Sequence, residues 1–104
     1  MFDFPNKVRY DILDTSARGT RRHRVLVEIL GGEFDDAARK FEESLVRIGY
    51  RKASGSVKGG RIQQVYKQAG KPTYYVLMQS AGVGPKLGSK DSTGSIHVMW
   101  NVND

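Results

Sequence analysis

Residues 25–50, VLVEILGGEFDDAARKFEESLVRIGY, contain the change of pattern that decides the fold class. Apolar residues occupy alternate positions in 25–29, which is typical of a β-strand with a buried face. After the glycines at 31–32, apolar residues recur at steps of three and four, as they do along one face of an amphipathic helix. They are Phe34, Ala37, Ala38, Phe41, Leu45 and Ile48. We therefore predict a strand followed by a helix over 33–48.

The charged residues of this segment suit the ends of such a helix. Asp35 and Asp36 fall in its first turn, where carboxylates interact favourably with the positive end of the helix dipole. Gly49 follows the last apolar residue and is a suitable left-handed C-cap, because glycine adopts a positive φ without steric cost. The helix is therefore expected to end near Ile48, with its charged face in solvent.

Strand patterns occur on both sides of the helix. Alternating apolar residues or short apolar runs predict strands at 8–12, 24–29, 61–68, 73–79 and 96–102. A further short strand at 50–57 is an open alternative. The element order is then β-β-α-β-β-β, and consecutive hairpins make most of the sheet antiparallel. We expect an α+β fold with a mostly antiparallel sheet of about four to five strands and a single amphipathic helix on one face.

The length of the chain, 104 residues, corresponds to a single α+β domain over 1–104. No cysteine is present, which excludes disulfides and is compatible with a reducing cytoplasm. We expect a cytoplasmic protein without membrane contact, because we find neither a signal-peptide pattern nor an apolar run of membrane-spanning length. Residues 80–94, SAGVGPKLGSKDSTG, are predicted to form a long Gly-rich loop that is either functional or flexible.

Basic residues are concentrated in the second half of the chain. The net charge is +6, and residues 51–90 contain eight basic residues and no acidic one. This asymmetry predicts an anionic partner, namely nucleic acid, an acidic protein or a phosphorylated ligand, although a solvated basic surface is the simpler alternative. The candidate anion or nucleic-acid contacts are Arg51, Lys52, Lys58, Arg61, Lys67, Lys71, Tyr75, Lys86 and Lys90.

Alternation along the strands divides the expected sheet into two faces. The face under the helix is assigned Val8, Tyr10, Ile12, Val25, Val27, Ile29, Ile96, Val98 and Trp100. The open face is assigned Arg9, Arg24, Leu26, Glu28, Tyr75, Leu77, His97 and Met99. Leu26, Leu77 and Met99 are predicted to form an apolar centre on it, and an exposed apolar patch marks an interaction site. The alternative function is therefore a protein-interaction or self-association module, with the protein a monomer or a weak homodimer.

No residue pattern points to catalysis, and we expect a non-enzymatic protein. Three residues separate Gly84 from Gly88, whereas a Walker phosphate loop has four between its glycines and is followed by a helix. His23 and His97 are isolated from carboxylates at metal-ligand spacing, so neither a metal nor a cofactor is predicted. A small metal-free nuclease that uses these two histidines as acid and base is the remote alternative.

One short passage resembles a known family. A strand and a helix followed by Gly49-Tyr50-Arg51 and Gly55-Ser56-Val57 resemble the same passage of VapD-like ribonucleases of toxin–antitoxin systems, over less than a third of the chain. The resemblance implies a ferredoxin-like fold with a second helix and an acidic residue at the end of the first strand. This sequence predicts no second helix, and only Glu28 lies near such an acidic position. We carry no site residue over from that family.

Overall fold

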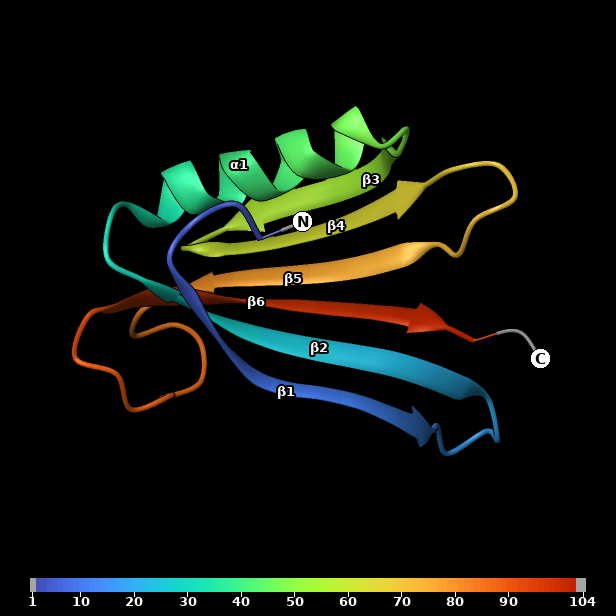
Figure 1. The fold of residues 1–104 in the computed structure, drawn as a ribbon, viewed down its shortest axis with the longest axis horizontal. Helices are drawn as coiled ribbons and strands as arrows, with labels where there is room; N and C mark the ends of the chain where they lie inside the picture. The colour runs from blue at the N-terminus through green and yellow to red at the C-terminus, as the bar shows by residue number, and fades with distance from the viewer. Residues whose placement is uncertain (1, 103–104) are drawn as a thin grey trace.

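Six antiparallel strands and one helix make up the computed structural model, which describes residues 2–102 (Figure 1). The strands are β1 (Asn6–Thr15), β2 (Arg21–Leu30), β3 (Arg51–Lys58), β4 (Arg61–Lys67), β5 (Tyr74–Ser80) and β6 (Ser92–Asn101). The helix α1 (Phe34–Arg47) connects β2 to β3. The order across the sheet is β1-β2-β6-β5-β4-β3, so β6 joins the β1–β2 hairpin to the β3–β4–β5 meander.

The α+β class is confirmed, but the predicted strand count and element order are wrong. The segment at 50–57, which the sequence pattern does not settle, forms the full strand β3, so six strands follow the order β-β-α-β-β-β-β. All eight residues of β3 are exposed, and it pairs with β4 at one edge of the sheet. Because pairing rather than burial holds this strand, its sequence lacks the apolar alternation by which strands are recognised.

The helix predicted over 33–48 is confirmed as α1. Glu33 occupies the N-cap, and Asp35 and Asp36 lie in the first turn. Gly49 has a φ of 101°, and the N–H of Tyr50 donates to the carbonyl of Leu45, so the chain leaves the helix through the expected left-handed glycine. No helix within residues 2–102 is long and apolar enough to cross a membrane.

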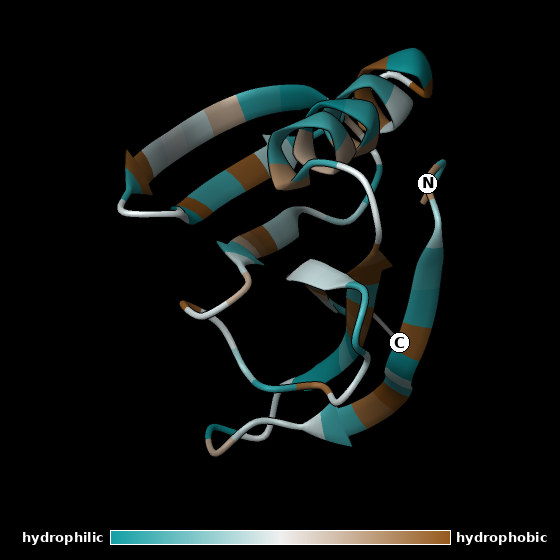
Figure 2. Ribbon diagram, turned by 90° about the vertical axis from the view of Figure 1, so that its left-hand side faces the viewer, coloured by the Kyte–Doolittle hydropathy of each residue, from teal (hydrophilic) through white to brown (hydrophobic). Residues whose placement is uncertain are grey.

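The core lies between α1 and the sheet face that the helix covers. Figure 2 shows the helix along one side of the curved sheet, with apolar and polar bands alternating along the strands. The buried cluster comprises Ile29, Ala37, Ala38, Phe41, Leu45, Tyr50, Tyr66, Val76, Met78, Ile96 and Val98. The N-terminal segment adds to it, because the Phe2 ring stacks on Phe41 with their centroids 5.7 Å apart. Within residues 2–102, this packing leaves the opposite face of the sheet without a covering helix.

A β-bulge in β1 corrects part of the predicted face assignment. Val8 pairs with Val27, but Tyr10 pairs with Leu26, so the register shifts by one residue at Arg9. A one-residue shift sends all following side chains to the other face of a sheet. Tyr10 and Ile12 therefore lie on the open face rather than under the helix, contrary to the prediction.

Candidate functional site

The face of the sheet opposite α1, here called the open face, presents side chains in rows that cross all six strands. Directly paired residues point to the same side, so the strand register defines each row. Read from β1 to β3, one central row is Ile12, Arg24, Met99, Tyr75, Val65 and Ser54. The adjacent row is Tyr10, Leu26, His97, Leu77, Gln63 and Ser56. The middle of the open face is therefore largely apolar and aromatic.

The three residues of the predicted apolar centre lie in these two rows. Leu77 and Met99 are partly exposed, whereas Leu26 is buried with 9% of its surface accessible. Leu77 and Met99 border a hollow of about 500 Å³ that extends toward β3. We call it the central hollow, and its lining includes the side chains of Val65, Tyr75, Leu77, His97 and Met99. The structure thus brings the predicted residues together, while a binding role for them stays a prediction.

His97 lies in the central hollow beside a cationic and aromatic cluster. Its ring meets the Tyr10 ring edge to face, with centroids 6.1 Å apart, and the guanidinium of Arg24 lies 5.5 Å from the Tyr10 centroid. Asp14 accepts hydrogen bonds from Arg22 at 2.8 Å and Arg24 at 2.9 Å, which lower the pKa of the Asp14 carboxyl. Burial, and then the charges of Arg24 and Arg22, lower the pKa of His97 from its ordinary value of 6.5 and so favour the neutral ring.

Four of the predicted cationic residues occupy the two ends of the open face on β3 and β4. Arg51 pairs with Lys67 at one end, and Lys58 pairs with Arg61 at the other. All four are exposed, and among residues 2–102 none of them forms an ion pair. Arg61 and Lys67 are six residues apart on β4, a separation of about 20 Å along an extended strand. The central hollow lies between these two cation pairs.

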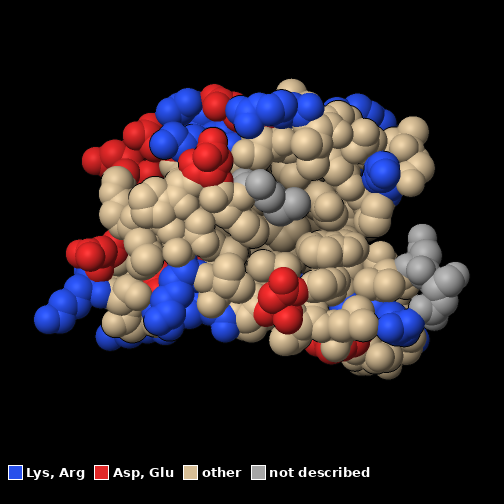
Figure 3. All heavy atoms as spheres, in the orientation of Figure 1, with Lys and Arg blue, Asp and Glu red and all other residues tan. Residues whose placement is uncertain are grey.

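The other predicted cationic residues do not join this group. Lys52 points to the helix side, where its ammonium lies 3.4 Å from the carboxylate of Glu42. Lys71 lies in the turn between β4 and β5, and Lys86 and Lys90 lie in the loop between β5 and β6. Lys86 borders a separate hollow of about 340 Å³ formed by that loop. Along α1, Figure 3 shows basic and acidic side chains together.

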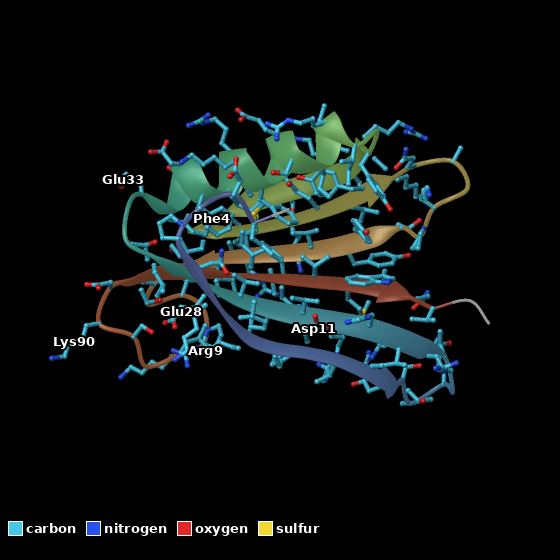
Figure 4. The ribbon with its side chains drawn as sticks, viewed as in Figure 1. Phe4, Arg9, Asp11, Glu28, Glu33 and Lys90 are labelled. Atoms are coloured by element: carbon cyan, nitrogen blue, oxygen red, sulfur yellow. The ribbon has the colours of Figure 1, made fainter. Side chains whose placement is uncertain are left out.

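Glu28 fixes the loop between β5 and β6, residues 81–91, to the sheet. Its side chain is fully buried and accepts hydrogen bonds from Arg9 Nε at 3.0 Å and from the Ser89 hydroxyl at 2.7 Å. Figure 4 shows Arg9 and Glu28 pointing toward one another beside the loop that carries Lys90. Burial alone would raise the pKa of Glu28, but the hydrogen bonds from Ser89, Arg9 and Ser92 outweigh it and lower the pKa to about 2.

The site predicted from the sequence does not include Glu28 as a binding or anchoring residue. One feature of the sequence could have identified this role: Glu28 is the single carboxylate within the apolar run Val25–Leu30. A buried acid needs cationic or hydrogen-bonding partners, so its position predicts a contact with other polar residues. Those partners could not be named, since Ser89 is 61 residues away and Arg9 reaches Glu28 from the bulge in β1. The strand predicted from 96 also begins earlier, at Ser92, so the loop is shorter than 80–94.

The two histidines lie on opposite faces of the sheet. His23 pairs with Trp100, and the two rings stack with centroids 4.5 Å apart. His23 also contacts the carboxylate of Asp11, whereas His97 borders the central hollow. The acid–base pair that the nuclease alternative requires is therefore not assembled. Within residues 2–102, no three His, Asp or Glu side chains are grouped so that they could hold a metal ion.

Comparison of the chain with protein-family models, curated proteins and solved structures finds no match. A function must therefore be inferred from the geometry and charge of the open face.

Proposed function

We propose that this protein binds single-stranded nucleic acid on the open face of its sheet. The observation that carries the proposal is the arrangement of Arg51–Lys67 and Lys58–Arg61 as two exposed cation pairs on either side of the central hollow. Cations neutralise the phosphates of a nucleic acid, and aromatic rings between them stack on unpaired bases. Asp14 and Glu28, two acids of the same face, are already engaged by arginines and lie on β1 and β2, away from β3 and β4.

The central hollow supplies surfaces on which bases can stack. Tyr75 has 42% of its surface exposed in the row between Met99 and Val65. His97 contributes a ring whose neutral form is favoured, because its pKa is lowered by burial and by the neighbouring arginines, and a neutral ring avoids an additional desolvated charge under a base. A duplex keeps its bases stacked inside, so it cannot offer their faces to these residues. We therefore expect a preference for single strands.

A salt series tests the electrostatic part of the proposal. Fluorescein-labelled oligo(dT) and oligo(U) are titrated with the protein, and anisotropy gives the affinity at each salt concentration. The double variant Arg61→Glu/Lys67→Glu should reduce both the affinity and the slope of log affinity against log salt, by about 0.7 for each phosphate that is no longer neutralised. The matched control Lys40→Glu/Arg47→Glu makes the same charge change on α1 and should affect the slope much less. Absence of binding at the lowest salt, or equal effects of both variants, overturns the proposal.

A second titration tests base stacking. Tyr75→Ala should weaken binding of oligo(dT) by about 5-fold to about 150-fold, because removal of one base–aromatic stack costs about 1–3 kcal/mol. Tyr75→Phe keeps the ring and should bind nearly as well as the parent. If both variants bind like the parent, the central hollow does not hold bases.

Self-association is the second candidate, supported by the apolar side chains of the same hollow. Leu77 and Met99 are partly exposed there, and no element within residues 2–102 covers them. Sedimentation equilibrium of the parent and of Leu77→Asp tests this candidate. A parent dimer that the variant abolishes supports it, whereas a parent that is monomeric at all concentrations excludes it.

A further inference from the structure

The outer edge of β3 is an open strand edge whose charged residues lie only at its two ends. β3 is the terminal strand of the sheet, and among the described strands it pairs with β4 alone. All eight of its residues are exposed, and its middle, 53–57, contains only Ala, Ser, Gly, Ser and Val. An exposed edge presents unpaired N–H and C=O groups, and charges or prolines in the middle of such a strand normally block further pairing. β3 has neither there.

The opposite edge of the sheet differs in this respect. Both edge strands contain a bulge, at Arg9 in β1 and at Ala53 in β3, but only in β1 are charged residues distributed along the whole strand, including Lys7, Asp11 and Asp14. Charged residues in the middle of an edge strand discourage another strand from pairing with it. The contrast indicates that β3 is the edge open to a partner strand.

A second copy of β3 is a poor partner for this edge. In a two-fold antiparallel pair with full overlap, Arg51 of one copy would lie opposite Lys58 of the other, at both ends of the pair. Like charges directly opposite each other destabilise a strand pair. The same two cations favour a partner strand that carries acidic residues at the corresponding positions.

We propose that β3 accepts an extended acidic strand from another protein by edge-to-edge pairing. Lys58 and Arg51 lie opposite Arg61 and Lys67, which are six residues apart on the unbulged strand β4. A regular partner strand should therefore carry two acids at positions i and i+6, on the side of the open face. Between them, small or β-branched residues suit the row of Ser54 and Ser56. Backbone hydrogen bonds would supply affinity, and the two acids would supply register.

The test uses a defined peptide, acetyl-Glu-Thr-Val-Thr-Val-Thr-Glu-amide, whose end residues are six positions apart. Its binding to the ¹⁵N-labelled protein is followed by amide chemical shifts and by hydrogen exchange. Changes in amide chemical shift and new protection from hydrogen exchange are expected in β3. The amides of β1, at the other edge of the sheet, serve as the internal reference. A peptide of identical charge with N-methyl groups on alternate residues of its pairing edge should bind about tenfold more weakly, because it lacks those backbone donors.

Charge is tested separately from pairing. Arg51→Glu/Lys58→Glu should weaken binding of the acidic peptide by about tenfold and strengthen binding of the version with lysine at both ends. The inference is overturned if the N-methylated peptide binds equally well, if the chemical-shift changes are confined to the central hollow, or if no binding occurs. A concentration-dependent dimer that protects β3 from hydrogen exchange would also overturn it. These outcomes do not depend on nucleic-acid binding, which is measured independently, although the two ligands should compete because both use Arg51 and Lys58.

Discussion

The hydroxyl of Ser89 donates a 2.7 Å hydrogen bond to the buried carboxylate of Glu28, although the two residues are 61 positions apart in the chain. The bond connects the glycine-rich loop 81–91 to β2, in which residues 25–29 are all buried. Arg9 donates to the same carboxylate and to the Ser89 hydroxyl, the latter at 3.0 Å. This three-residue cluster positions the loop at the Lys58–Arg61 end of the open face.

Removing the serine hydroxyl should loosen this loop. Ser89→Ala leaves a buried carboxylate with one donor fewer, which costs about 1.5–3 kcal/mol in the free energy of unfolding. Chemical denaturation measures this destabilisation, and hydrogen exchange should become faster in 81–91 than elsewhere. Lys90→Ala, at an exposed neighbouring position, is the control and should change stability little. Equal exchange rates in the parent and Ser89→Ala would show that the bond does not hold the loop.

The free energy of unfolding should depend on pH through the carboxyl group of Glu28. The pKa of its carboxyl is about 2 in the folded protein, against an ordinary value of 4.5, so the unfolded chain binds the proton more readily. The stabilisation is therefore complete above about pH 4.5 and is lost as the pH falls toward 2. Thermal unfolding of the parent and of Glu28→Gln across this window checks the prediction. The stability difference between them should shrink as the pH falls, and a constant difference would contradict it.

Gly94 should not tolerate a side chain. A Cβ at this position would lie 2.5 Å from the backbone oxygen of Gln79 and 2.7 Å from the Phe34 ring. Gly94→Ala should therefore lower the free energy of unfolding by about 3 kcal/mol, because the first of these neighbours is backbone and cannot rotate away. Gly82→Ala is the control, since its Cβ would meet nothing within 4 Å and only the positive φ of 86° costs about 1 kcal/mol. Similar destabilisation of the two variants would contradict the predicted steric overlap.

The ring of His97 should titrate below its ordinary pKa of 6.5. Burial is the larger cause, and the charge of Arg24 adds to it. Arg24→Gln should therefore move the pKa of His97 upward, as measured by the pH dependence of its ring NMR signals. Arg61→Gln removes a cation elsewhere on the open face and should move it less. A His97 pKa that is unchanged by Arg24→Gln would show that this charge is not felt in the central hollow.

Much of the open face could be predicted from alternation alone. The residues assigned to it on β2, β5 and β6, including Leu26, Leu77 and Met99, lie there because these strands are regular over those positions and alternate with a strict period of two. Alternation misplaces Tyr10 and Ile12, because the bulge at Arg9 adds one residue to β1 and no local feature of the sequence marks it. The strand β3 could not be assigned firmly, because an exposed edge strand has no burial pattern.

By itself, the sequence determined the α+β class, the helix predicted over 33–48, most of the apolar face beneath it and the excess of basic residues after 50. These properties depend on periodicity and composition, which are local. Only the tertiary structure decided which cations gather, because strand pairing brings Arg51 to Lys67 and Lys58 to Arg61 while it turns Lys52 toward Glu42. It also joined Glu28 to Ser89 and separated His23 from His97. Such relationships depend on register between distant strands, which no single stretch of sequence encodes.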